Sequence, residues 1–292
     1  MSRTIQIGSK KVGDGFPTYI VAEIGINHNG DLNLAKQMVD VGARYGVDAI
    51  KLQKRTPELC VPPEQQTQMR ETPWGYISYL DYRKKVEFGE KEYSEIDRYC
   101  RELDITWFAS VWDIPAVEFM ERYNPACYKI PSASLTDHEL LRRVRKTGKP
   151  IILSTGMSTM EQIKNAAEVV GLDNLLLTHT TSSYPCEPEE LNLRTIQTLK
   201  DTFDVPVGYS GHEVGLIPSA VAVAMGACLI ERHITLDRAM WGTDQAASVE
   251  PVGVEKLVKY IRVTERSLGD GVKRVYDSEL PSLRKLRRVQ DK

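Results

Sequence analysis

The sequence lacks the marks of an exported or membrane-embedded protein. Its five cysteines include no C-x-x-C pair and are odd in number, which favours a reducing compartment over a disulfide framework. Residues 1–15 contain no apolar core, so we expect no signal peptide. The longest apolar stretch, 215–230, contains Pro218 and Ser219 and is too short to span a bilayer. We therefore expect a cytoplasmic protein with no membrane partner.

A strong net charge is also missing. The formal net charge is −2, which gives no overall basic surface for nucleic acid. An anionic substrate would have to be met by positive charge gathered locally. Hydrophobic residues make up 41% and charged residues 27% of the 292 residues, as is usual for a globular protein with one large domain or two small ones.

Eight short runs of apolar residues are spread along the chain. Each is nearly continuous in apolar residues rather than alternating, which is typical of strands that are covered on both faces. The runs are 19–25, 48–53, 105–112, 126–132, 150–155, 174–180, 205–212 and 228–235.

Amphipathic segments with helix-start signals lie between these runs. Asp31 is expected to cap one helix, and Thr136-x-x-Glu139 and Ser158-x-x-Glu161 have the spacing of capping boxes. The alternation of strand and helix predicts an α/β protein with a single (β/α)₈ TIM barrel over residues 1–275. A doubly wound open sheet is the alternative, but Gly25 and Gly30 do not have the spacing of its glycine-rich fingerprint.

Two segments fall outside this regular pattern. Residues 4–13 are expected to form a short N-terminal β-hairpin that plugs the bottom of the barrel. The connection after the second barrel strand is long, and its extra segment, 55–89, is polar and aromatic. It follows the carboxyl end of a strand, so it would lie at the catalytic face, either as a lid or as a structural cap.

Polar side chains stand near the end of every apolar run. Barrel enzymes carry their chemistry at this position, and burying so many polar groups needs partners. The residues are Glu23, Lys51, Gln53, Ser110, Lys129, Ser132, Ser154, Thr180 to Ser183, Ser210, His212, Glu231 and His233.

Two lysines are the most informative of these residues. Lys51 and Lys129 each lie in an otherwise apolar run, where an ammonium group requires an anion. With the neighbouring serines they would bind a phosphate and a carboxylate. The alternative is that they form internal ion pairs with Glu23 and Glu231.

Two histidines end adjacent strands. His212 and His233 would converge in the barrel mouth, and with Glu23 and Asp244 nearby they suit Mn²⁺ or a similar divalent ion, with Mg²⁺ and Co²⁺ as further candidates. His28 follows the first strand and either joins this site or supports its loop.

Taken together, these residues resemble a known family, the sialic acid (N-acetylneuraminate) synthases. Seven motifs match in the family's order between about residue 20 and 251. They are Ala22-Glu23-Ile24-Gly25-x-Asn27-His28-Asn29-Gly30, Lys51-Leu52-Gln53, Tyr128-Lys129-Ile130-x-Ser132, Leu153-Ser154-Thr155-Gly156-Met157, Gly208-Tyr209-Ser210-x-His212, Glu231-x-His233-x-Thr235, and Gly242-Thr243-Asp244 with Ser248-x-Glu250-Pro251.

The resemblance implies a role for each site residue. His212 and His233 would hold the metal. Phosphoenolpyruvate would be bound by Lys51, Ser110, Lys129, Ser132, Ser154 and Ser210. The sugar and a metal-bound water would be faced by Glu23, Gln53, Tyr184 and Asp244, with Ser182 also in the substrate site.

The implied reaction is a metal-dependent condensation of phosphoenolpyruvate with a sugar aldehyde, N-acetylmannosamine or a related aldose. The metal would polarise the aldehyde, the enol carbon would attack it, and water would add at the cationic C2 as phosphate leaves by C–O cleavage. Glu23 would stabilise that carbon or handle a proton.

The chain departs from the family pattern in three places. Ser182 replaces the usual Asn before Tyr184, and Ser134 replaces an acidic residue. Residues 276–292 resemble only the linker that precedes the family's C-terminal antifreeze-like domain, so we expect a short tail or helix there and no such domain. This leaves the identity of the acceptor open.

Two other functions are compatible with parts of the pattern. One is a different metal-dependent barrel aldolase, and the other is a non-catalytic regulator that binds a sugar or a phosphate. One combination of residues favours the synthase, because a non-catalytic binder would not need ligands for both a metal and an enol phosphate. These residues are Glu23, Lys51, Lys129, His212 and His233. The family resemblance also suggests a homodimer.

Overall fold

The protein forms a closed barrel of eight parallel strands in a computed structural model that describes residues 3–289. The strands follow the order β10-β11-β12-β3-β4-β7-β8-β9 around the barrel, which excludes the open sheet. Their bounds are β3 (Tyr19–Gly25), β4 (Ala49–Lys54), β7 (Thr106–Val111), β8 (Tyr128–Ile130), β9 (Ile151–Ser154), β10 (Leu175–Thr180), β11 (Val207–Gly211) and β12 (Leu229–His233). The predicted TIM barrel is confirmed.

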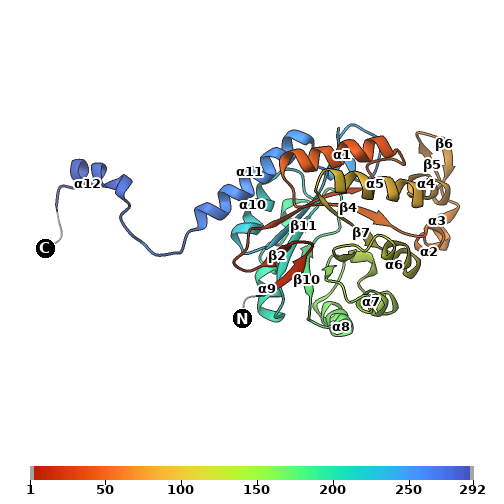
Figure 1. The fold of residues 1–292 in the computed structure, drawn as a ribbon, viewed down its shortest axis with the longest axis horizontal. Helices are drawn as coiled ribbons and strands as arrows, with labels where there is room; N and C mark the ends of the chain where they lie inside the picture. Colours follow the sequence, from red (N-terminus) through yellow and green to blue (C-terminus); the bar gives the residue numbers. More distant parts are fainter. Residues whose placement is uncertain (1–2, 290–292) are drawn as a thin grey trace.

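Helices surround the barrel, as Figure 1 shows. They bury apolar stripes against the strands while their polar faces meet solvent. Their bounds are α1 (Leu32–Tyr45), α5 (Glu90–Glu102), α6 (Ile114–Glu121), α7 (His138–Arg145), α8 (Met160–Val170), α9 (Thr195–Thr202), α10 (Ile217–Ala224) and α11 (Pro251–Leu268). Short 3₁₀ turns lie at η1 (Ser132–Ser134), η2 (Pro188–Glu190) and η3 (Gln245–Ala247).

The helix starts were predicted with mixed success. Asp31 caps α1 as expected, accepting hydrogen bonds from the backbone N–H groups of Asn33 and Leu34. Both predicted capping boxes are wrong by one residue. Asp137 rather than Thr136 caps α7, because its carboxylate reaches the N–H of Leu140 at 3.0 Å. Thr159 caps α8, while the Ser158 hydroxyl donates to the Gly156 carbonyl instead.

The N-terminal hairpin closes one end of the barrel. Strands β1 (Thr4–Ile7) and β2 (Lys10–Gly13) pair antiparallel, as predicted. Ile5, Ile7 and Val12 are buried against apolar side chains from the interior of the strands, among them Phe108 and Leu176. The lower barrel is therefore packed with side chains, and the chemistry must lie at the other end.

The long connection between β4 and β7 folds into its own small structure. It contains α2 (Pro57–Cys60), α3 (Pro63–Gln66), the antiparallel pair β5 (Met69–Thr72) and β6 (Gly75–Ser78), and α4 (Tyr79–Val86). In Figure 1 these elements lie at the right-hand end of the barrel, beyond the strand ends. Tyr82, Val86 and Ile26 form a small separate core there, with Trp241 packed against it.

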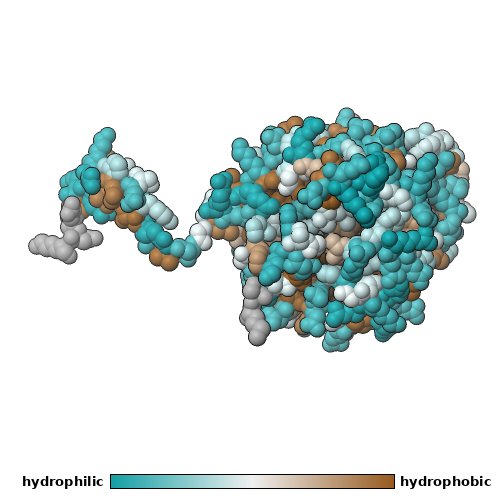
Figure 2. Space-filling model, viewed as in Figure 1, coloured by the Kyte–Doolittle hydropathy of each residue, from teal (hydrophilic) through white to brown (hydrophobic). Residues whose placement is uncertain are grey.

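The C-terminal part leaves the barrel at the opposite end. Helix α11 packs between α1 and α10 and is followed by an extended segment, the turn η4 (Asp277–Glu279) and helix α12 (Leu280–Leu286). We call residues 270–289 the C-terminal arm. Figure 2 shows it standing clear of the rounded barrel, with exposed hydrophobic residues such as Val272, Tyr276 and Leu286. The predicted domain boundary at residue 275 stays a prediction, and residues 290–292 of the predicted tail lie outside the described residues.

Within residues 3–289, no helix combines the length and apolar character that crossing a bilayer requires.

Candidate active site

Strand register brings the predicted polar residues to one level of the barrel. Glu23 of β3 lies beside both Lys51 of β4 and His233 of β12. On the other strands, Ser110 pairs with Lys129 and Ser210 with Glu231. Along β12, alternate residues point inward, so Glu231 and His233 face the barrel axis while Arg232 points outward to Glu213. Parallel pairing therefore converts separate strand ends into one ring of functional groups.

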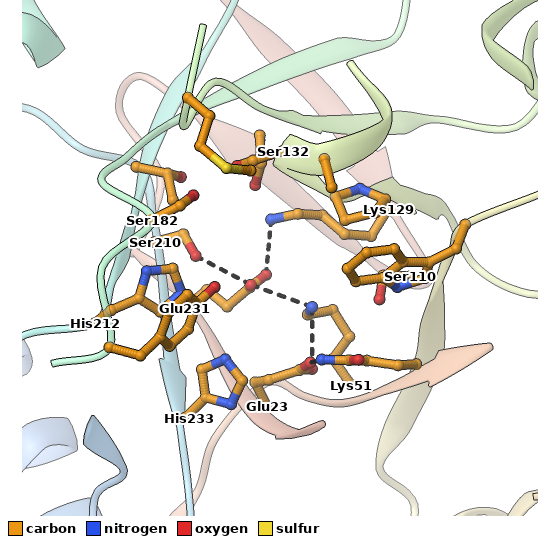
Figure 3. A pocket seen from close by; sticks show the side chains of 18 residues that line it. Glu23, Lys51, Ser110, Lys129, Ser132, Ser182, Ser210, His212, Glu231 and His233 are labelled. Atoms are coloured by element: carbon orange, nitrogen blue, oxygen red, sulfur yellow. Dashed lines mark hydrogen bonds and ion pairs between the residues drawn. The ribbon is translucent and has the colours of Figure 1, made fainter. Parts of the chain in front are cut away.

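These side chains line a cavity of about 190 Å³ at the carboxyl ends of the strands (Figure 3). Every predicted site residue except Asp244 belongs to its wall. The lining residues are Glu23, Lys51, Gln53, Ser110, Trp112, Lys129, Pro131, Ser132, Ala133, Ser154, Met157, Thr180, Ser182, Tyr184, Ser210, His212, Glu231 and His233.

A buried network of ion pairs forms the floor of the cavity. The two carboxylate oxygens of Glu231 lie 3.2 Å from Lys51 Nζ and 2.9 Å from Lys129 Nζ, so one carboxylate bridges both lysines. Lys51 Nζ also lies 3.0 Å from Glu23 Oε2. Figure 3 shows Glu231 at the centre of this network. The internal ion pairs that the sequence left as an alternative are thus present.

The two buried carboxyl groups differ in their electrostatic surroundings. Burial alone would raise the pKa of Glu231, but the ammonium groups of Lys129 and Lys51 outweigh it and hold that pKa well below the ordinary value. Burial raises the pKa of Glu23, and Lys51 only partly offsets the effect. Glu231 is therefore a fixed anion, whereas Glu23 is suited to carry a proton.

The two lysines differ as well. Burial lowers the pKa of Lys129, against the opposing attraction of Glu231. For Lys51 burial acts in the same direction, but Glu23 and Glu231 outweigh it and raise the pKa. With one firmly ionised carboxylate between two ammonium groups, the site can accept additional negative charge.

Hydroxyl groups stand above the lysines. Ser154 Oγ lies 2.9 Å from Thr178 Oγ1, which in turn accepts a bond of 3.4 Å from Lys129 Nζ. The backbone N–H of Gly156 donates to Ser132 Oγ at 3.0 Å. A side chain at residue 156 would collide with the hydroxyls of Ser132 and Ser182. Glycine here lets both serines approach the backbone and face the cavity.

The two histidines lie side by side in the cavity wall, with ring centroids 5.5 Å apart. His212 Nδ1 is 2.7 Å from the Thr181 carbonyl, which fixes that nitrogen as a donor and leaves Nε2 with a free lone pair. Burial, and secondarily His233, lowers the pKa of His212 to about 3, so its ring is neutral. His233 Nδ1 is buried without a hydrogen-bond partner.

This pair fits a divalent ion with open positions. Two neighbouring imidazoles, one with an unsatisfied buried nitrogen, are ligands that Mn²⁺ and related ions accept. Within residues 3–289, no group of three or more His, Cys, Asp or Glu side chains forms a closed metal site. The remaining positions would fall to water and substrate oxygens.

Two residues lie differently from the sequence-based picture. Asp244 is not among the residues that line the cavity, but its carboxylate oxygen lies 4.0 Å from His233 Nδ1. His28 does not join the site either. Its Nδ1 accepts a bond from the Gly30 N–H and its ring stacks on Phe88 at 3.8 Å, so it supports the loop after β3.

Several residues of the site were missed by sequence reasoning or given a lesser role. Glu231 was predicted as a polar strand end and as an ion-pair partner but was given no role in catalysis or binding, although its place two residues before His233 puts both on the inner face of β12. Trp112 lines the cavity with an unpartnered indole N–H, and Arg55 stacks on its ring at 3.7 Å. Nothing in the local pattern distinguishes Arg55 from a surface arginine.

The family model described as the NeuB family matches residues 38–273. The chain belongs to the NeuB family. This membership confirms the resemblance seen in the sequence motifs and identifies the chain as an enzyme of the sialic acid synthase type, a carbon–carbon bond-forming transferase.

The chain is similar to proteins of several organisms. The chain is 37% identical to the N-acetylneuraminate-9-phosphate synthase of Homo sapiens, over 94% of this chain and 78% of that protein. It is 36% identical to the N,N'-diacetyllegionaminic acid synthase of Campylobacter jejuni, over 93% of this chain and 83% of that protein.

A solved relative has nearly the same fold. The N-acetylneuraminic acid synthetase of Leptospira borgpetersenii, solved in complex with citrate, superposes with a TM-score of 0.87 at 33% identity. The match covers 99% of both chains.

Proposed function

We propose that this NeuB-family protein condenses phosphoenolpyruvate with an N-acetylated sugar aldehyde, giving a 2-keto-3-deoxy sugar acid and inorganic phosphate. The observation that carries the proposal is the pair of buried lysines, bridged by a single carboxylate, at the floor of a cavity ringed with hydroxyls. Phosphoenolpyruvate brings a phosphate and a carboxylate, and this floor offers donors for both.

The donor half of the site follows from burial. Lys129 and Glu231 are 1% and 4% exposed, so their charges stand where water competes least. Lys51, Lys129 and the hydroxyls of Ser110, Ser132, Ser154 and Ser210 would hold the enol phosphate. Ser182, beside Ser132 at Gly156, would add another hydroxyl.

The acceptor half lies toward the opening of the cavity. Gln53 donates to Glu23 Oε1 at 3.1 Å, and the half-exposed Tyr184 packs on His212 with ring centroids 4.1 Å apart. These side chains would orient the sugar aldehyde above the enol carbon. The names of the relatives above, synthases of acetylated nonulosonic acids, support N-acetylmannosamine or a related aldose as acceptor.

His212 and His233 would hold a divalent metal, most suitably Mn²⁺, with Mg²⁺ and Co²⁺ as alternatives. Bound there, the ion supplies Lewis acidity toward the aldehyde oxygen. Asp244, 4.0 Å from His233 Nδ1, would act as a positioning residue for the His233 ring or for a water beside it.

The bond changes balance with the groups present. The C3 carbon of the enol forms a bond to the aldehyde carbon, and the positive charge that develops at C2 is met by the carboxylate of Glu231. Water adds at C2, the C2–O bond to phosphate breaks, and a ketone results. Glu23, whose pKa is raised by burial, would transfer the proton between water and the new hydroxyl group.

Phosphate release from phosphoenolpyruvate with Mn²⁺ across a panel of aldoses tests the proposal. We expect release that depends on the aldose, with ¹⁸O from the bridging oxygen of phosphoenolpyruvate recovered in the phosphate. Product formation that depends on the aldose but releases no phosphate would favour an aldolase that acts through a pyruvate enolate. Absence of both product and phosphate release with every aldose would contradict the synthase assignment.

The histidine pair is tested separately. His233→Ala should reduce turnover by roughly 1,000-fold or more, because transition-state charge stabilisation would be lost, while the far-ultraviolet circular dichroism spectrum is unchanged. Mn²⁺ binding followed by electron paramagnetic resonance should be lost in the same variant. Full activity of His233→Ala would contradict the assignment of His233 as a metal ligand.

A further inference from the structure

Three arginines in the segment between β4 and α5 lack an acidic partner among the described residues. Within residues 3–289, no carboxylate oxygen lies within 4.0 Å of the guanidinium nitrogens of Arg55, Arg70 or Arg83. The Nε atom of each is buried without a hydrogen-bond partner, and so is Nη2 of Arg83. Arg83 as a whole is only 5% exposed. Unpaired buried charges of this kind are costly and need an explanation.

Arg55 contacts two residues of the cavity wall, and Arg70 and Arg83 share the Tyr82 ring as a neighbour. Arg55 hydrogen-bonds to Gln53 and stacks on Trp112, and both of these residues line the cavity. Arg70 of β5 stacks on Tyr79 at 3.8 Å and lies 5.8 Å from the Tyr82 ring. Arg83 of α4 lies 5.8 Å from the same ring.

The missing carboxylate partners leave the three positive charges without a neutralising group, because a guanidinium stays protonated in proteins. Burial, and next the neighbouring Arg83, lowers the pKa of Arg55 to about 10. The nearest acidic influence on Arg55 is Glu87, but that carboxylate already binds Lys54 Nζ at 2.8 Å and the Arg55 backbone N–H at 3.1 Å. The cluster therefore carries excess positive charge at neutral pH.

Aromatic packing explains only part of this arrangement. Stacking uses the flat faces of the Arg55 and Arg70 guanidiniums, and apart from the Arg55 N–H that donates to Gln53 it leaves the N–H groups at their edges unused. Those edges are the donors that bind phosphate in paired, planar geometry. A purely structural cluster would have no reason to hold three such edges together without an acceptor.

We propose that Arg55, Arg70 and Arg83 form a second anion subsite, which binds a phosphate group on the far end of the acceptor sugar. The inference rests on the proposed condensation, since it places the acceptor between the lysines below and the arginines above. Gln53 connects the two levels, because it donates to Glu23 on one side and accepts from Arg55 on the other.

Equilibrium binding measured by calorimetry, without phosphoenolpyruvate, tests the subsite directly. Wild-type protein should bind N-acetylmannosamine 6-phosphate at least about 10-fold more tightly than N-acetylmannosamine, as charge-assisted hydrogen bonds imply. Arg83→Met should reduce that preference to about 3-fold or less. Arg122→Met is the matched control, because Arg122 is exposed and pairs with Glu90 on the outside of the barrel.

Stability measurements separate binding from folding. Arg83→Met removes a charge without a partner, so its ligand-free melting temperature should equal or exceed that of the wild type. The less buried Arg70→Met should also reduce the preference for the phosphate, and it serves if Arg83→Met fails to fold. Equal affinity of the wild type for both sugars, or an unchanged preference in both variants, would overturn the subsite.

Turnover distinguishes this inference from the proposed function. If both sugars were condensed with the same kcat/KM, the synthase proposal would be supported and the phosphate subsite would be contradicted. If the 6-phosphate bound tightly but no aldose were condensed, the phosphate subsite would be supported and the synthase proposal would be contradicted. Tighter binding of the 6-carboxylate (uronate) analogue than of the 6-phosphate would also overturn the assignment to phosphate.

Discussion

At the scale of single residues, Glu231 organises the floor of the site. It accepts from Lys51, Lys129 and Ser210 through its two oxygens. The carboxylate thereby keeps two buried ammonium groups at a spacing that a substrate can use, while Glu23 keeps the higher pKa that proton transfer requires. Neighbouring carboxyl groups thus acquire distinct tasks from their surroundings.

Lys129→Met should raise the KM for phosphoenolpyruvate by roughly 100-fold, because removing one buried charged partner costs about 3 kcal/mol. The KM for the sugar should change far less, since Lys129 lies at the floor of the cavity. Steady-state kinetics with each substrate varied in turn measures both values. Lys164→Met, on the exposed side of α8, is the control. An unchanged KM for phosphoenolpyruvate would contradict the role of Lys129.

His28 makes stability depend on pH. Burial, and next Arg83, lowers the pKa of His28 to about 3, compared with about 6.5 in an unfolded chain. Below pH 6.5 the unfolded state binds the extra proton, so this contribution to stability is lost as pH falls toward 3. The loss by pH 5 is about 2 kcal/mol.

His28→Asn should remove this dependence, because an amide oxygen can still accept from the Gly30 N–H but does not titrate. Urea unfolding at pH 8 and pH 5 should show a loss of stability about 2 kcal/mol smaller in the variant than in the wild type. Equal losses in both proteins would show that the histidine is protonated in the folded state.

At the scale of elements, Asp113 joins the long β4–β7 connection to the barrel. Its carboxylate caps α6 through the Ala116 N–H at 2.7 Å and also accepts from the Thr56 N–H at 2.5 Å and the Cys60 thiol at 3.1 Å. One buried side chain therefore fixes both the start of a helix and the start of the segment that carries the arginines.

Asp113→Ala should lower the free energy of unfolding by about 2–4 kcal/mol, since it removes a helix cap and leaves buried donors unsatisfied. Ser78→Ala is the matched control. Ser78 caps the exposed start of α4 through the Asp81 N–H, and its loss should cost only about 1 kcal/mol. Chemical denaturation compares the two, and equal effects would contradict the joining role of Asp113.

The elements also mark what the sequence could and could not predict. The barrel strands were predictable because burial on both faces leaves continuous apolar runs, and the polar strand ends identified most of the polar groups in the cavity wall. Strands β5 and β6 were not predicted, since they are short, polar and largely exposed. The arginine cluster was missed because no local pattern reveals the packing of Arg70 and Arg83 on Tyr79 and Tyr82 or that of Arg55 on Trp112.

At the scale of the whole molecule, the barrel and the C-terminal arm are separate in their packing. Residues 270–289 are exposed except for partial burial of Leu280 and Leu283, and α12 packs on η4 rather than on the barrel. A chain that ends at Gly271 should therefore melt within about 2 °C of the full chain, because few barrel contacts are lost. Calorimetry measures this, and a fall of about 5 °C or more would show that the arm stabilises the barrel.

The hairpin of β1 and β2 has a consequence for the timing of the reaction. Among the described residues it fills the lower end of the barrel, so the cavity floor is reached from the mouth at the carboxyl ends of the strands. A molecule bound to the lysines is then covered by any molecule that binds nearer the mouth. Access from one side therefore orders the reaction. Phosphoenolpyruvate binds before the sugar, and the phosphate that remains at the cavity floor dissociates after the sugar acid.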